Sequence, residues 1–244
     1  MGTKIGTAGY LSQAKPYIQK FPFSMGMWVY PNNLSGANSV IFFLGVDSAT
    51  YTKLYSNTTT LTLELANGGS PKKATIPNMF TLNQWTYLVL EYTNGTVPIL
   101  FRAMTSSGVI SSNSATPPGS NLGTNLTLTL GGESPIAGNN FTGVIAEFWM
   151  SNSVIQPDGL ALSMSTMRTL MERGPFAFPH IKQNLATYHS FRQSFPPNHD
   201  VMGEVYPGPK GREIWTSSSA TVGPHPPLTG DYDSFNYTTV NTIC

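Results

Sequence analysis

Short runs in which polar and apolar residues alternate recur through the first 150 positions of the chain. In residues 60–65, leucines at every second position alternate with polar residues. A period of two places the apolar side chains on one face of a β-strand, so such runs indicate half-buried antiparallel strands. Similar alternation covers residues 24–30 and 125–130. More continuously apolar runs, expected of central strands covered on both faces, lie at residues 39–46, 85–92 and 141–150. The pattern therefore predicts an all-β antiparallel sandwich.

Turn-forming residues separate these runs at intervals that suit a sandwich. The clearest case is Asn94-Gly95, which lies between two apolar runs and predicts a β-hairpin. One later segment has helical spacing instead, with apolar residues at Leu160, Met164, Met167 and Met171. Asp158 is a suitable N-cap and Gly174 a suitable C-cap. We therefore expect one short helix over residues 159–172, packed on the sandwich.

Proline and glycine recur from residue 174 to the end of the chain, too often for a compact second core. The sequence thus divides into a β-sandwich over residues 1–173 and an extended C-terminal arm over residues 174–244. The arm carries many aromatic side chains, which need a surface to bury them. We expect contacts from Phe176, Phe178, Tyr188, Phe191, Phe195 and Trp215. A second copy of the chain or a particle shell protein is the expected surface, and the chain's own sandwich is the alternative.

Charge excludes several classes of partner. Charged residues make up only 10% of the chain and the net charge is +1, which provides no general attraction for nucleic acid or anionic lipid. The single cysteine excludes an internal disulfide. No run of about 18 apolar residues occurs, and the first ten residues lack the apolar core of a secretory signal. We therefore expect a protein made in the cytoplasm that binds neither nucleic acid nor a membrane.

Three segments, in order, resemble landmarks of the laminin-G-like, concanavalin A-like jelly-roll family. They are FPFSMGMWVYP at residues 21–31, LNQWTYLVL at residues 82–90, and LTLGGES followed by NNFTGVIAEFWMSNSVI within residues 128–155. The resemblance implies an antiparallel jelly roll over about residues 8–173. Taken one by one, the landmark residues are also explained as large core aromatics and turn glycines. They therefore indicate a fold rather than a chemical reaction.

Catalysis is not expected. Glycoside hydrolases in this fold class need two carboxylates about 5 to 9 Å apart. The strand that would carry them, residues 144–150, offers only Glu147. The chain has no serine nucleophile elbow, and its four histidines lack zinc-site spacing. No cofactor is expected either, apart from the calcium that family members often bind at the sandwich rim. The aspartates available for it are Asp47, Asp158, Asp200, Asp231 and Asp233.

Two non-enzymatic functions remain. NLATYHSF at residues 184–191 is similar to the C-terminal extension of laminin-G-like proteins in tailed-phage structural gene clusters. The first interpretation is therefore a virion structural protein, made in the host cytoplasm, that decorates the head or tail of a tailed phage as a homo-oligomer. The alternative is a lectin or adhesin that binds surface glycans. Its contacts would come from residues expected in loops, namely Tyr51, Tyr55, Asn57, Asn139 and Asn140.

Overall fold

The structure is a computed structural model. It describes residues 2–5, 9–14, 22–93, 99–115, 126–133, 139–155, 163–189, 198–199, 213–216, 221–224 and 226, and every structural statement below refers to these residues.

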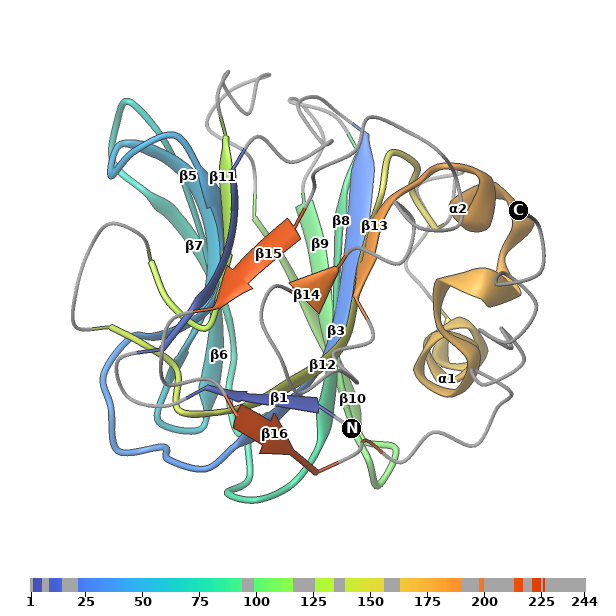
Figure 1. The fold of residues 1–244 in the computed structure, drawn as a ribbon, viewed down its shortest axis with the longest axis horizontal. Helices are drawn as coiled ribbons and strands as arrows, with labels where there is room; N and C mark the ends of the chain where they lie inside the picture. Colours follow the sequence, from blue (N-terminus) through green and yellow to red (C-terminus); the bar gives the residue numbers. More distant parts are fainter. Residues whose placement is uncertain are drawn as a thin grey trace, which may run out of the picture.

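Two antiparallel sheets face each other across one core (Figure 1). Sheet A has the order β10-β9-β8-β3-β12-β1-β16, with β13 also paired to β12. Its strands are β1 (Gly2–Ile5), β3 (Phe23–Pro31), β8 (Thr86–Tyr92), β9 (Ile99–Thr105), β10 (Ile110–Ala115), β12 (Gly143–Ser151), β13 (Leu185–His189) and β16 (Thr221–Gly223).

Sheet B has the order β14-β15-β2-β11-β4-β5-β6-β7. Its strands are β2 (Leu11–Ala14), β4 (Ser39–Gly45), β5 (Thr50–Asn57), β6 (Thr60–Asn67), β7 (Lys72–Ile76), β11 (Thr127–Leu130), β14 (Asn198–His199) and β15 (Glu213–Thr216). Consecutive strands β4 to β7 form a meander. The all-β sandwich predicted from the alternation is thus confirmed.

The core lies where the alternating pattern places it. Leu61, Leu63 and Leu65 of β6 are buried between the sheets, and the apolar face of β3 meets them from sheet A. All residues of β4, β8 and β12, the three runs predicted to be central, are buried. Strands β8 and β9 pair antiparallel, as the hairpin prediction requires. Its turn residues, Asn94 and Gly95, lie outside the described part of the chain.

The outer face of sheet A is covered by helices (Figure 1). Helix α1 (Met164–Arg173) is followed by the 3-10 turn η1 (Gly174–Ala177) and the short helix α2 (Pro179–Gln183). Met167 and Leu170 of α1 are buried in a cluster with the aromatic residues of sheet A. As far as the described residues go, no helix is both long and apolar enough to cross a lipid bilayer.

Helix α1 begins later than the sequence pattern predicts. Its N-cap is Ser163, whose Oγ accepts a hydrogen bond from the Thr166 amide at 3.1 Å, whereas Asp158 lies outside the described residues. The predicted C-cap is confirmed, because Gly174 has a φ of 61° and donates its amide to Leu170. Met164, in the first turn, is 49% exposed, so not every residue of the predicted apolar helix face packs on the sandwich.

The described part of the arm lies on the chain's own sandwich. Strand β13 extends sheet A by pairing with β12, β15 pairs with β2 in sheet B, and β16 pairs with β1 in sheet A. This is the arrangement that sequence analysis left as the alternative. The division of the chain at residue 173 remains a prediction, and these strands show that arm segments take part in both sheets.

Candidate functional site

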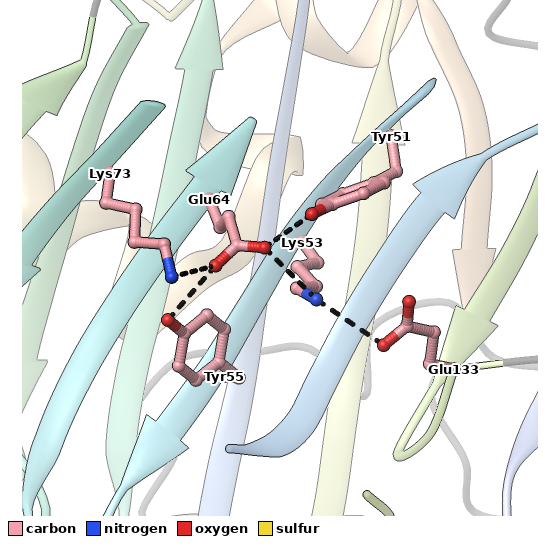
Figure 2. A network of polar contacts seen from close by, with 6 residues as sticks. All are labelled: Tyr51, Lys53, Tyr55, Glu64, Lys73 and Glu133. Atoms are coloured by element: carbon pink, nitrogen blue, oxygen red, sulfur yellow. Dashed lines mark hydrogen bonds and ion pairs between the residues drawn. The ribbon is translucent and has the colours of Figure 1, made fainter. Parts of the chain in front are cut away.

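The outer face of sheet B carries a polar cluster, here called the Glu64 cluster, which consists of Tyr51, Lys53, Tyr55, Glu64, Lys73 and Glu133 (Figure 2). Strand register brings most of it together. Lys53 of β5 lies opposite Glu64 of β6, and Glu64 lies opposite Lys73 of β7. Because side chains alternate along a strand, Glu64 points away from the core that takes Leu63 and Leu65.

Glu64 is the centre of this cluster. Its Oε1 accepts the Tyr51 hydroxyl at 2.5 Å and lies 3.2 Å from Lys53 Nζ. Its Oε2 lies 2.7 Å from Lys73 Nζ and accepts the Tyr55 hydroxyl at 3.2 Å. Figure 2 shows the carboxylate with these four donors around it. Each oxygen of the buried carboxylate therefore has two partners, which satisfies its acceptor capacity.

The pKa values of the cluster follow from these contacts. Burial alone would raise the pKa of Glu64, but hydrogen bonds from Lys73 and Tyr51 and the nearby charge of Lys53 lower it to about 2. The hydrogen bond to Glu64 raises the pKa of Lys73. Burial, together with the hydrogen bond to Glu64, raises the pKa of Tyr51. At neutral pH the Glu64 carboxylate is thus ionised, Lys73 is charged and Tyr51 keeps its proton.

Lys53 connects Glu64 to a second carboxylate. Its Nζ lies 3.5 Å from Glu133 Oε2, and it also lies 4.7 Å from the ring centroid of Tyr51 and 5.7 Å from that of Tyr55. These distances are within the range of cation–π attraction. Two carboxylates and two aromatic rings surround the Lys53 ammonium, and the Lys53 side chain is only 16% exposed. The four charged members of the cluster neutralise one another.

Glu133 reaches the cluster because the chain turns after β11. Gly131 has a φ of 80°, a conformation that favours glycine, and a Cβ at this position would collide with Ile5. The Gly131 amide donates to Ile41 at 2.8 Å, which fixes the turn on β4. Glu133, only two residues later, is 5% exposed.

This arrangement is unsuited to acid–base catalysis. A general acid or base needs a pKa near the working pH and a lone pair or proton free for substrate. Glu64 has neither, because its pKa is about 2 and its oxygens are occupied. Among the residues that the structure describes, no group of three or more His, Cys, Asp or Glu is placed to hold a metal ion.

Glu147, the one carboxylate on the strand where the family's hydrolases carry their acids, is also inaccessible. It lies at a bulge in β12 with a φ of 51° and is fully buried. The Tyr188 hydroxyl of β13 donates a hydrogen bond to its Oε2. Glu147 therefore ties an arm strand to the sandwich and cannot contact a substrate in this conformation.

Comparison with known proteins agrees with the fold. The model of the Concanavalin A-like lectin/glucanases superfamily, in its laminin G form, matches residues 6–161. The chain belongs to this superfamily. No curated protein is similar enough in sequence to count as a relative.

Solved structures with the superfamily's fold resemble the chain at low sequence identity. A putative carbohydrate binding protein from Bacteroides ovatus has a TM-score of 0.58 and 14% identity, over 92% of this chain and 60% of that chain. Tailspike protein 2 of the Escherichia coli O157:H7 bacteriophage CAB120 has a TM-score of 0.51 and 13% identity, over 70% of this chain and 24% of that chain. The chain thus spans about a quarter of the tailspike's length.

Within this superfamily fold, the residues named for glycan contact lie partly where we expected them. Tyr51 and Tyr55 are not in loops: they belong to β5, are 8% and 5% exposed, and direct their hydroxyls to Glu64. This corrects the expected loop placement. The run TYTKLYSN is mostly polar, so it lacks the apolar alternation that indicates a strand, although it forms β5. Asn57 ends β5 and is exposed.

The two asparagines of the 139–140 segment lie next to β4. The Val40 amide donates to the Asn139 carbonyl at 2.7 Å, and Val40 forms a bridge with Asn140. Because Val40 also pairs with Tyr55, this places three of the five predicted residues close together. The sequence analysis missed Lys53, Glu64, Lys73 and Glu133. An available signal was the spacing of Tyr51, Lys53 and Tyr55, which puts them on one face of a strand.

The predicted arm contacts are described in part. Phe176 and Phe178 pack against the cluster on the outer face of sheet A, and Tyr188 is a buried member of it. The rings of Phe176 and Tyr188 meet edge to face, with centroids 5.0 Å apart. Trp215 belongs to β15, opposite Ser12 of β2. Phe191 and Phe195 lie outside the described residues.

Of the aspartates considered for calcium, only Asp47 falls in the described part of the chain. Its Oδ1 accepts the amides of Ala49 and Thr50, each at 2.8 Å, as expected of a turn-stabilising side chain. The other four, Asp158, Asp200, Asp231 and Asp233, lie outside it.

Proposed function

We propose that the protein is a non-enzymatic structural protein of a virus particle, which decorates the head or tail of a tailed phage. The observation that carries the non-enzymatic part is the state of Glu64, whose carboxylate is ionised and fully hydrogen-bonded by residues of the same chain. Such a group stabilises a sheet face and has no capacity left for substrate. The fold is therefore used here for shape and contact rather than for chemistry.

The placement on a particle rests on sequence properties. The near-neutral composition and the single cysteine suit a protein that is made in the cytoplasm and later exposed outside the cell. A phage tailspike has a similar fold, so this fold occurs in phage proteins. At 13% identity the similarity concerns the fold alone. A particle shell protein or a second copy of the chain is the proposed partner.

Glycan binding is the second candidate function. It is favoured by Asn57, Asn139 and Asn140, whose main chains lie near that of Tyr55, because amide side chains hydrogen-bond well to sugar hydroxyls. It is disfavoured because, among the residues whose side-chain burial is described, the exposed large apolar residues are Val46, Leu82, Val109 and Met164, and none of these is aromatic. A stacking platform for a sugar ring is thus missing from the described surface.

Three measurements on the full chain separate these functions. Mass spectrometry of purified phage particles should detect the protein at a fixed copy number per particle. A reducing-end assay on a panel of polysaccharides should give no product, and a glycan array should give no saturable binding. Absence from particles combined with saturable glycan binding would reverse the order of the two candidates, and sugar release that disappears in Glu64→Gln would refute the non-enzymatic assignment.

A further inference from the structure

Asn67 is the last residue of β6, and a glycine follows it. Asparagine before glycine is prone to spontaneous deamidation, because no side chain hinders the backbone nitrogen that attacks the asparagine amide. The sequence contains two such pairs, and Asn67-Gly68 is the one that lies in the described part of the chain. Both residues are exposed, and a Cβ added at Gly68 would have no atom within 4 Å. The pair is therefore open to water and sterically unhindered.

One hydrogen bond opposes the reaction. The Gly68 amide, which contains the nitrogen that would attack, donates its proton to the Ala49 carbonyl at 2.8 Å. While this bond is closed, the nitrogen keeps its proton and points away from the Asn67 side chain. The bond lies beside the terminal β5–β6 pair, Thr50 and Asn67. Because strand ends open at a much lower free energy than the core, this bond can break while the sandwich stays folded.

The turn that supplies the carbonyl is held by Asp47. Its Oδ1 accepts the amides of Ala49 and Thr50, each at 2.8 Å, and the Val46 amide donates to the Thr50 carbonyl at 2.9 Å. The Ala49 carbonyl belongs to this same short segment. The Asp47 side chain therefore controls how firmly the acceptor is presented to Gly68.

We propose that Asn67 is a site of spontaneous deamidation whose rate is set by the opening of the Gly68–Ala49 hydrogen bond. In the open form the Gly68 nitrogen forms a bond to the side-chain Cγ of Asn67. The bond from Cγ to the amide nitrogen breaks, and that nitrogen leaves as ammonia with the proton that Gly68 gives up. A five-membered succinimide ring remains, and water opens it to aspartate or isoaspartate. Water is the only co-reactant.

The product differs from the starting protein in charge. A carboxylate at position 67 adds one negative charge, so the net charge falls from +1 to 0. Position 67 lies opposite Thr50, whose amide is bound by the carboxylate of Asp47, so the new charge weakens the turn by like-charge repulsion. A protein without net charge also associates more readily. Deamidation at Asn67 thus gives a slow, irreversible change in how the surface interacts.

Mass spectrometry of the tryptic peptide that contains Asn67 measures the conversion, with the full chain incubated in warm, mildly alkaline buffer. We expect slow conversion in the native protein and the fastest conversion in urea. Asp47→Ala should speed conversion of the native protein about fivefold, the change expected from the loss of one hydrogen bond. Asp47→Asn is the matched control, because its amide oxygen still accepts the two backbone amides, and it should convert at nearly the wild-type rate.

A pair of glycine substitutions tests which nitrogen attacks. Gly68→Ala and Gly69→Ala each add a methyl group that has no atom within 4 Å, but only the first adds it beside the attacking nitrogen. Conversion should be lost in Gly68→Ala over the time in which half of the wild-type protein converts, and it should be unchanged in Gly69→Ala. Gly68 has a φ of 69°, so alanine strains the turn, and strain alone would speed the reaction instead.

Three results would overturn the proposal. The first is a native protein that stays unconverted while the protein in urea converts completely. The second is a native rate equal to the rate in urea, or unchanged by Asp47→Ala, since the hydrogen bond would then not control the reaction. The third is equal slowing by Gly68→Ala and Gly69→Ala.

Discussion

Glu64→Gln is the substitution that tests the Glu64 cluster most directly. Glutamine keeps the size of the side chain and imitates the protonated carboxyl group, but it removes the charge that Lys53 and Lys73 neutralise. The pKa of Glu64 is lowered from 4.5 to about 2 in the folded protein. At about 1.36 kcal/mol for each pKa unit, the ionised carboxylate contributes about 3 kcal/mol to the free energy of unfolding at pH 7. Because Lys73 is half exposed and screened by solvent, this figure is the upper end.

The pH dependence of this loss has a definite sign. The folded pKa of Glu64 lies below the unfolded one, so the contribution is fully present above pH 4.5 and is lost as the pH falls towards 2. The wild-type protein should thus be more stable than Glu64→Gln by up to about 3 kcal/mol at pH 7, by roughly 1.4 kcal/mol at pH 3, and by almost nothing near pH 2.

Urea unfolding at pH 7, 4 and 3 measures this difference, with the slope of the unfolding free energy checked for constancy. Glu172→Gln on helix α1 is the matched control, because Glu172 lies outside the cluster. It should shift the midpoint little at any of these pH values. A Glu64→Gln protein that is as stable as wild type at pH 7, or a difference that does not shrink with acid, would show that the four donors do not hold an ionised carboxylate.

Three further substitutions test the packing and the arm. Gly26→Ala should lower the free energy of unfolding by about 1 to 3 kcal/mol, because the added Cβ would lie 2.6 Å from Trp149 Nε1. Its control is Gly69→Ala, whose Cβ would have no atom within 4 Å and which should change the free energy of unfolding by less than about 0.5 kcal/mol. Urea unfolding measures both. Ser163→Ala should cost about 1 kcal/mol through loss of the α1 N-cap, and an unchanged melting temperature would contradict the assigned helix start. Gly223→Ala should speed hydrogen exchange of the β1 amides while core amides keep their protection, and uniform protection would contradict the close packing of β16.

The fold could be predicted from the sequence because its strongest signal is local. A period of two in residues 60–65 places Leu61, Leu63 and Leu65 on one face whatever the rest of the chain does, and these leucines lie in the core. The ordered segments that resemble the laminin-G-like family added the jelly-roll topology, which the family match confirms. The start of helix α1 was misplaced because Asp158 and Ser163 are both good N-caps, and a pattern cannot choose between two caps five residues apart.

The Glu64 cluster could not be predicted because it depends on register between strands. Lys53, Glu64 and Lys73 are nine or more positions apart in the sequence, and a slip of one residue between β5 and β6 would point Glu64 into the core. Tyr51 and Tyr55 were assigned to loops for a related reason. Their strand is polar on both faces, so it lacks the apolar alternation by which strands such as β6 are recognised.

The few charges of this chain are arranged to cancel locally, and this affects how the protein can associate. In the Glu64 cluster, two lysines face two glutamates within 3.5 Å, and the chain as a whole carries a net charge of only +1. A surface with so little net charge gives weak long-range attraction to any partner. Association with a partner must then rest on short-range contacts. Within the chain the same rule is visible at the β1 edge, where the close packing of Gly223 on Val144 makes the pairing of β16 depend on shape and register rather than on charge.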